Sequence, residues 1–131
     1  MSQFVIRISA VSQMCEPLEL QELSEQTLCK LLDTDVAERL RVPEVPPFLQ
    51  DSPDRVLCYL IDARGGEKSL PTNLCGTCFY HTGCPVYGDL VLVMCSRNEA
   101  DTSLFGFTKA QSEALIRWLA EQFSFLQFQH I

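Results

Sequence analysis

The chain has 131 residues, 47% of them hydrophobic, which predicts one folded domain with a sizeable core and excludes a disordered chain. Seventeen acidic residues against ten basic ones give a net charge of −7, which argues against binding nucleic acid or an acidic membrane through charge. No apolar run approaches the roughly 20 residues of a membrane span. The opening residues lack the basic segment of a signal peptide, so we expect a cytoplasmic protein.

The first third of the chain predicts two strands, a helix and a third strand. Residues 4–9 carry apolar side chains at every even position, as one face of a strand does, and residues 16–20 predict a second strand. A helix capped by its first residue is expected over Ser24–Leu32. Residues 36–42 are assigned to a short strand. Four prolines between residues 43 and 54 forbid regular structure there and make this the one long loop.

The middle of the chain predicts a strand, a tight turn and the central strand of a sheet. Residues 56–61 are an apolar run of strand length, and residues 64–67 (RGGE) are a strong turn signal. Together they predict a hairpin that returns through residues 68–70. Residues 73–80 close as a turn of helix or as an irregular loop. Residues 90–95 (LVLVMC) are the most apolar run and predict the centre of the sheet.

The last predicted element is a helix with a clear start. Thr108 and Gln111 have the spacing of a capping box, and apolar residues at helical intervals continue to Phe123. With strands outnumbering helices and no regular alternation between them, the whole chain, residues 1–131, predicts a single α+β domain. We expect a largely antiparallel sheet, with the short helix of the N-terminal half and the longer C-terminal helix packed on one face.

The tail after this helix is unusually apolar and contains Phe125, Leu126 and Phe128. One interpretation is a C-terminal segment folded back on the core, and this is favoured because tied-down termini are common. The other is a docking interface for a second subunit or another protein, since an apolar patch of this size is usually covered.

Four residues suggest a metal site. Cys75, Cys78, His81 and Cys84 recur at three-residue steps, and a C-x2-C loop presents two thiolates to a tetrahedral zinc ion. Structural zinc sites normally join two such pairs across a longer spacer, whereas these four ligands would need a strained loop. We therefore expect no cofactor, and a zinc-stabilised module remains the alternative.

The remaining cysteine chemistry does not point to an enzyme. Seven cysteines, an odd number without a secretory signal, predict reduced thiols in a cytosol. Cys29, Cys58 and Cys95 lie in apolar patterns and are expected in the core. A dithiol switch at Cys75 and Cys78 lacks the long helix that positions such pairs. The chain also lacks the common motifs for nucleophilic, phosphate-binding and metalloprotease sites, so we expect no enzyme.

Three short motifs carry a resemblance to a known family. The run Leu70-Pro-Thr-Asn73, Thr77 within a Gly-Thr pair, and Gly88-Asp89 before the apolar strand resemble a family of small domains of unknown function common in phages and mobile elements of Firmicutes. The cysteines and the aromatic tail depart from that family's pattern. The resemblance implies a setting but no activity, and it makes residues 75–84 the variable loop of a structural turn.

The polar residues of these motifs are the remaining candidates for a site. Turns use residues such as Asn73, Thr77 and Asp89 most often, and the functional alternative is that the three line a small polar pocket beside the sheet. We predict a non-enzymatic accessory domain that binds a protein partner or a second copy of itself, through the aromatic tail or a sheet edge. The alternative is a small-ligand-binding or zinc-stabilised module centred on residues 73–89.

Overall fold

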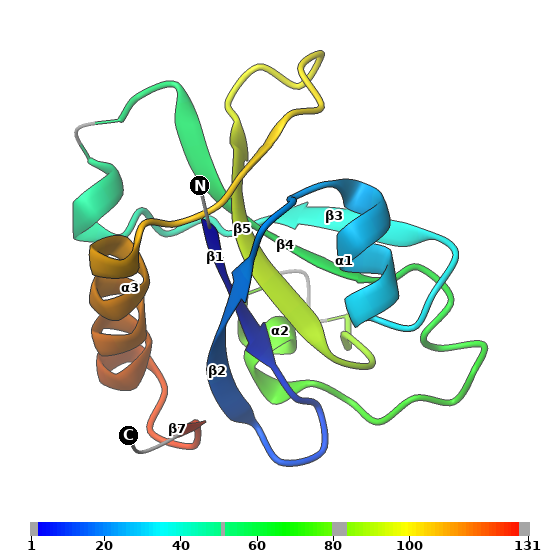
Figure 1. Cartoon of the computed structure of the whole chain (residues 1–131). Coiled ribbons are helices and arrows are strands. Elements are labelled where there is room, and N and C mark those ends of the chain that lie inside the picture. The colour runs from blue at the N-terminus through cyan, green and yellow to red at the C-terminus, as the bar shows by residue number, and fades with distance from the viewer. Residues whose placement is uncertain (1–2, 51, 80–83, 129–131) are drawn as a thin grey trace.

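The computed structural model describes residues 3–50, 52–79 and 84–128, and every structural statement below concerns these residues. They form seven strands, three α-helices and one 3-10 turn (Figure 1). In chain order these are β1 (Gln3–Ile8), β2 (Met14–Leu20), α1 (Glu25–Leu31), β3 (Ala37–Arg41), η1 (Pro47–Leu49), β4 (Arg55–Asp62), α2 (Leu74–Phe79), β5 (Leu90–Ser96), β6 (Leu104–Phe105), α3 (Lys109–Gln122) and β7 (Gln127–Phe128).

The strands form one sheet in the order β3–β4–β5–β1–β2–β7, with β6 paired to β5 outside this path. All pairings are antiparallel except the parallel contact between β2 and β7. Because β5 lies between β4 and β1, the prediction of a central strand over residues 90–95 is confirmed. The α+β class and the largely antiparallel sheet are confirmed as well.

The two longer helices cover opposite faces of the sheet, so the prediction that both pack on one face is wrong (Figure 1). Leu28 of α1 belongs to the same buried cluster as Leu60. Leu115 of α3 belongs to a second cluster with Tyr59 and Leu92. Side chains alternate between the two faces of a strand, and β4 and β5 are apolar on both faces. A sheet of this kind needs a cover on each side.

The helix starts follow the sequence closely. The hydroxyl oxygen of Ser24 accepts a hydrogen bond from the N–H of Thr27 at 3.1 Å and caps α1. At α3, Thr108 Oγ1 accepts from the Gln111 N–H at 3.1 Å, and Gln111 Oε1 accepts from the Thr108 N–H at 2.9 Å. The predicted capping box is therefore confirmed.

Two predictions about the connecting segments are wrong. Residues 68–70 do not return beside β4, because β3 and β5 already occupy its two edges. Their N–H groups instead bond to the carbonyls of residues 64–66 and close a series of turns. The proline-rich loop over residues 43–54 also contains regular structure, the short η1, since proline is tolerated in a first helical turn. Residues 73–80, left open between helix and loop, contain the helix α2.

The apolar tail folds back on the sheet. Leu126 is buried with 5% of its surface exposed, while Phe125 and Phe128 are half-buried against the cluster that contains Leu115. Tail residues 127 and 128 pair with residues 14 and 15 of β2. The fold-back interpretation therefore describes the tail, and the predicted interface at Phe125, Leu126 and Phe128 remains a prediction.

A chain of ring contacts anchors this tail to the core. The rings of Tyr59 and Phe79 lie 5.7 Å apart, those of Phe79 and Phe123 5.1 Å, and those of Phe123 and Phe125 5.6 Å. These separations fall in the range of favourable aromatic pairs. The contacts thus run from β4, beside the edge strand β3, through α2 and the end of α3, to the tail.

The expectation that all cysteines are reduced thiols is wrong for one pair. Cys58 on β4 and Cys95 on β5 form a disulfide, with their Cα atoms 6.3 Å apart. Cys58 is directly opposite Val93, so Cys95 is its diagonal neighbour on the same face, within reach of a disulfide. Both residues are buried, which confirms their predicted place in the core, while Cys29 is only partly buried.

This pairing fixes how many thiols the protein presents. Unfolded in guanidinium without reductant, the chain should show five reactive thiols with a thiol-specific dye, and seven after reduction. In a Cys58→Ser/Cys95→Ser double variant the number should be five under both conditions. Seven thiols in the unreduced natural chain would contradict the disulfide.

Candidate functional site

Asn73 connects three segments through one buried amide. Its side chain is fully buried just before α2. Nδ2 donates to the carbonyl oxygens of Ile8 and Gly88, each at 3.1 Å, and Oδ1 accepts from the Gly76 N–H at 3.1 Å. The Asn73 N–H also donates to the carbonyl of Val86 at 2.7 Å. The end of β1, the segment before β5 and the first turn of α2 are thereby joined.

Thr77 continues this network one turn further along α2. Its hydroxyl donates to the carbonyl of Asn73 at 2.9 Å, and the oxygen accepts from the Val86 N–H at 3.0 Å. The neighbouring Gly76 allows α2 to approach this segment closely, because an added Cβ would lie 2.8 Å from Val86 Cγ1. The Gly-Thr pair is therefore explained by packing and hydrogen bonding within the chain.

Asp89 holds the turn between β1 and β2. Its carboxylate accepts from Arg7 Nη2 at 2.7 Å and from the Ala10 N–H at 2.9 Å. Asn73 and Thr77 both direct their polar atoms to other groups of the chain. Of the three predicted pocket residues, only Asp89 lines one of the hollows described below.

The predicted zinc ligands lie in different surroundings. Cys75 is fully buried, Cys78 and Cys84 are exposed, and His81 lies outside the described residues. Burial raises the pKa of the Cys75 thiol, and burial raises the pKa of the nearby Cys15 to about 12. Zinc binds thiolates, so burial disfavours Cys75 as a ligand. In the described parts of the chain, no three metal-ligating side chains come together.

A buried carboxylate that the sequence analysis did not select lies at the end of β4. Asp62 is 4% exposed, and Oδ1 accepts from Thr34 Oγ1 at 2.8 Å and from the Arg64 N–H at 2.9 Å. Oδ2 accepts from Lys68 Nζ at 2.7 Å. Burial would raise the pKa of Asp62, but these hydrogen bonds and the Lys68 charge outweigh it and hold the pKa below its usual value. An acidic residue directly after a buried strand was the available signal.

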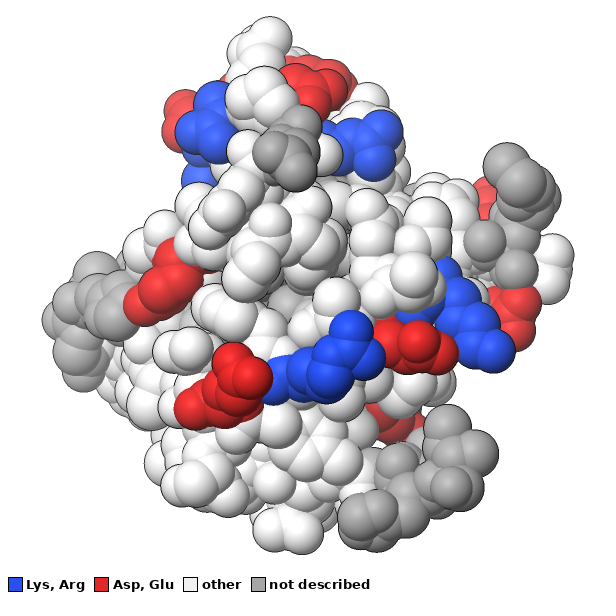
Figure 2. Space-filling model, turned by 90° about the vertical axis from the view of Figure 1, so that its left-hand side faces the viewer, with Lys and Arg blue, Asp and Glu red and all other residues white. Residues whose placement is uncertain are grey.

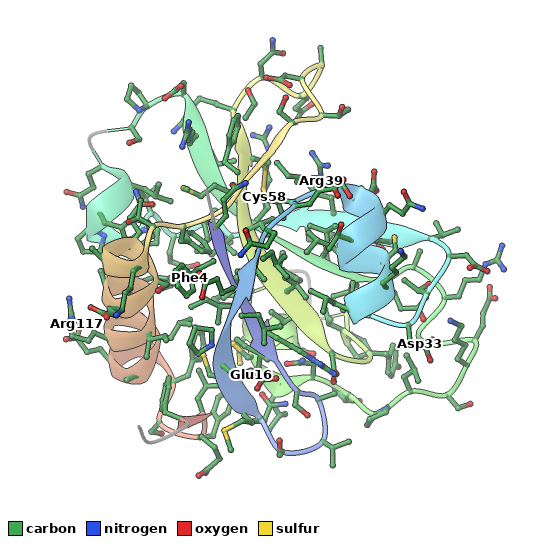
Figure 3. The ribbon with its side chains drawn as sticks, viewed as in Figure 1. Phe4, Glu16, Asp33, Arg39, Cys58 and Arg117 are labelled. Atoms are coloured by element: carbon green, nitrogen blue, oxygen red, sulfur yellow. A yellow bond between two sulfur atoms is a disulfide. The ribbon has the colours of Figure 1, made fainter. Side chains whose placement is uncertain are left out.

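Three adjoining hollows beside this carboxylate form what we call the acidic trough. The first, of about 590 Å³, lies between α1 and the start of β3. The second, of about 540 Å³, shares Lys30 and Asp35 with the first. The third, of about 230 Å³, shares Asp33 and Lys68 with the second. Asp33 lies at the right of Figure 3, between the end of α1 and the segment after β4.

Carboxylates outnumber amines along the trough, and exposed valines lie at its ends. Five carboxylates and two amines line it, and in sequence order these belong to Glu25, Lys30, Asp33, Asp35, Asp62, Lys68 and Asp89. Among the described residues, no salt bridge joins Asp33 or Asp35 to a basic group. Val36 lines the first hollow and is 46% exposed, and Val11 lines the third and is 82% exposed. The excess of negative charge thus lies in the first and third hollows, while the second is lined by two aspartates and two lysines, and an exposed apolar residue lies at each end of the trough.

The face covered by α3 differs from the trough. Figure 2 shows a row of alternating negative and positive side chains across this face, with further charged side chains of both signs at the top of the view. The exposed charges of α3 are Lys109, Glu113, Arg117 and Glu121, which alternate in sign every four residues. Such a pattern is typical of a solvated helix surface. It gives this face no excess of either charge.

No model of a known protein family matches this chain, and no curated protein or solved structure matches it significantly. In the described part of the chain, the helices are too short or too polar to cross a membrane. The function is therefore inferred from the residues and their geometry.

The hydrogen bonds to Asp62 predict a pH-dependent contribution to stability. Because its pKa is lowered in the folded state, this contribution is complete above the ordinary aspartate pKa of about 3.9 and is lost as the pH falls through the lower folded value. Asp62→Asn should reduce the unfolding free energy at pH 7 by about 1–3 kcal/mol, and the difference should shrink towards pH 3. Urea unfolding followed by Trp118 fluorescence measures both. A difference that stays constant from pH 7 to pH 3, or one matched by the exposed Asp54→Asn, would contradict this role.

Proposed function

We propose that this chain is a non-enzymatic accessory domain that binds a protein partner, and that the partner presents an extended basic segment to the acidic trough. The observation that carries the proposal is the pair of carboxylates, Asp33 and Asp35, which form no salt bridge with the described residues and line the trough between two exposed valines. An extended segment with alternating basic and apolar side chains would meet both features at once.

The trough lies beside a sheet edge that can receive such a segment. β3 pairs with β4 on one side only, as the terminal strand of the sheet. Alternate backbone groups of an edge strand point away from its partner, and added peptide strands bind through such groups. Val36 and Ala37 line the first hollow at the start of β3. The trough can therefore supply charge while the edge supplies backbone hydrogen bonds.

The net charge favours the same kind of partner. At −7 the chain attracts basic surfaces over distances of about 8–10 Å at moderate salt. Electrostatic attraction of this type accelerates encounter and selects the partner more than it adds affinity. We therefore expect binding to weaken as salt rises.

The chemistry of the interior supports binding over catalysis. The buried thiols of Cys15 and Cys75 have raised pKa values, which keeps them protonated, and the carboxylate of Asp62 is fully engaged by hydrogen bonds. An activated nucleophile or general base usually needs the opposite shift and an accessible atom. In the described residues, every buried side-chain nitrogen and oxygen has a hydrogen-bond partner.

The proposal is tested with a fluorescent ten-residue peptide of alternating lysine and valine, and with its glutamate–valine counterpart. The lysine peptide should bind by fluorescence anisotropy and perturb the amide signals of Val11, Asp33 and Val36, whereas the glutamate peptide should not bind. Asp33→Asn/Asp35→Asn should weaken binding about fivefold or more, because two charge interactions are lost.

The matched control is Glu113→Gln/Glu121→Gln on α3, which removes the same charge elsewhere on the surface. This control should keep the affinity within about twofold. Equal losses in both double variants would show general charge attraction and would contradict the trough as the site. So would signal changes confined to α3 or the tail.

A further inference from the structure

The free edge of β3 carries opposite charges along its length. Its start adjoins the acidic trough, because Ala37 lines the first hollow together with the carboxylates of Glu25 and Asp35. Its second half carries Arg39, which is labelled in Figure 3, and Arg41. A strand rises about 3.3 Å per residue, so Arg41 lies about 13 Å along the strand from Ala37.

Strand register places both arginines on the face of the sheet that α1 covers. Arg39 is opposite Leu60 and Arg41 is opposite Cys58, and both of these partners belong to the buried cluster beneath α1. Opposite residues on neighbouring strands share a face. The first hollow of the trough is on the same face, since residues of α1 line it. Acidic and basic side chains therefore follow one another on one side of the edge strand.

Backbone carbonyls hold the two arginines without cancelling their charge. Arg39 Nη2 donates to the carbonyl of Thr102 at 3.2 Å, and Arg41 Nη2 donates to that of Arg97 at 2.9 Å. Among the described residues, the one salt bridge to either joins Arg41 to Glu99 at 3.9 Å, and it contributes little because the Glu99 side chain is 87% exposed. The hollow beside Arg41 is lined by three arginines and one carboxylate. This half of β3 is thus positive.

The hydrogen bonds to β4 show which backbone groups of β3 face outwards. The carbonyl of Val36 accepts from the Ala63 N–H at 3.0 Å, and the Val42 N–H donates to the carbonyl of Leu57 at 2.9 Å. Bonding groups alternate along a strand in an antiparallel pair. The even-numbered residues therefore bond to β4, and the groups of residues 37, 39 and 41 face the free edge.

These outward groups can pair with an added strand. The Ala37 N–H bonds to the sulfur of Cys29 and is not available. An antiparallel strand centred opposite Arg39 bonds to the N–H and carbonyl of Arg39, to the Ala37 carbonyl and to the Arg41 N–H. Antiparallel pairs are slightly more stable per residue than parallel ones, so we expect this direction.

We infer that the partner of the acidic trough is an extended segment with unlike charges in its two halves. It adds to β3 as an antiparallel strand, with acidic side chains beside Arg39 and Arg41 and basic side chains at the trough. The inference rests on the proposed function, since it specifies the partner of that site. Salt screens charges beyond about 8–10 Å, which is less than the length of β3, so each half of the edge selects its own charge. In an antiparallel strand, the acidic half comes first in the sequence of the partner.

Three fluorescent ten-residue peptides, each alternating a charged residue with valine, test the inference. The first carries lysines alone, the second carries two glutamates followed by three lysines, and the third carries three lysines followed by two glutamates. The glutamate-first peptide should bind at least about fivefold more tightly than the glutamate-last peptide in fluorescence anisotropy, because it alone presents each charge to its opposite. It should also shift the amide signals of Arg39 and Arg41. The two mixed peptides have the same composition, so their difference reports the order of charges.

Two variants and a control assign this preference to the arginines. Arg39→Gln/Arg41→Gln should reduce the preference to below about twofold and leave the affinity for the lysine peptide unchanged or higher. Arg39→Lys/Arg41→Lys keeps both charges and should keep the preference, which separates the loss of charge from a loss of folding. The control Arg117→Gln removes an exposed charge from α3 and should leave the preference unchanged.

The lysine peptide separates the inference from the proposed function. If it binds while the two mixed peptides bind equally, or while neither of them binds, the inference is overturned and the proposed function stands. Tighter binding of the glutamate-last peptide would also overturn the inference. If none of the three peptides binds, both the inference and the proposed function fail.

Discussion

The buried amide of Asn73 is the interaction on which the arrangement of the loops depends. It forms hydrogen bonds with the carbonyls of Ile8 and Gly88 and with the N–H of Gly76. Asn73 is fully buried, so water cannot replace these bonds. A buried polar group is costly when it is unpaired, so these groups stay together. The same contacts fix the start of β5 and Asp89, which in turn holds the turn between β1 and β2.

The second constraint is that the centre of the sheet is apolar on both faces. α1 must cover one face while α2, α3 and the tail cover the other, and polar groups are left to the rims. At one rim, the end of α1 and the segment after β4 gather carboxylates around Lys68. The acidic trough thus follows from where the covering elements end.

Local signals in the sequence predict the elements well and their arrangement less well. The caps at Ser24 and Thr108 and the central strand depend on neighbouring residues, and they are confirmed. The predicted hairpin through residues 68–70 is wrong because β4 pairs with the preceding strand β3 and with β5, which leaves no free edge, and no turn signal reveals this. The acidic trough was missed for the same reason, since Asp33 and Asp62 meet only in the fold. The sequence also singled out Asn73 and Asp89 as candidate pocket residues, and their polar atoms bond within the chain.

The most direct test of this account is the unfolding free energy of Asn73→Ala, measured by urea denaturation beside the exposed neighbour Thr72→Ala. Removing the amide leaves two buried carbonyls and one N–H without their partner, so Asn73→Ala should lose at least about 2–3 kcal/mol. Thr72→Ala should change the free energy by no more than about 0.5 kcal/mol. An Asn73→Ala protein as stable as the Thr72→Ala control would contradict the central role of this residue.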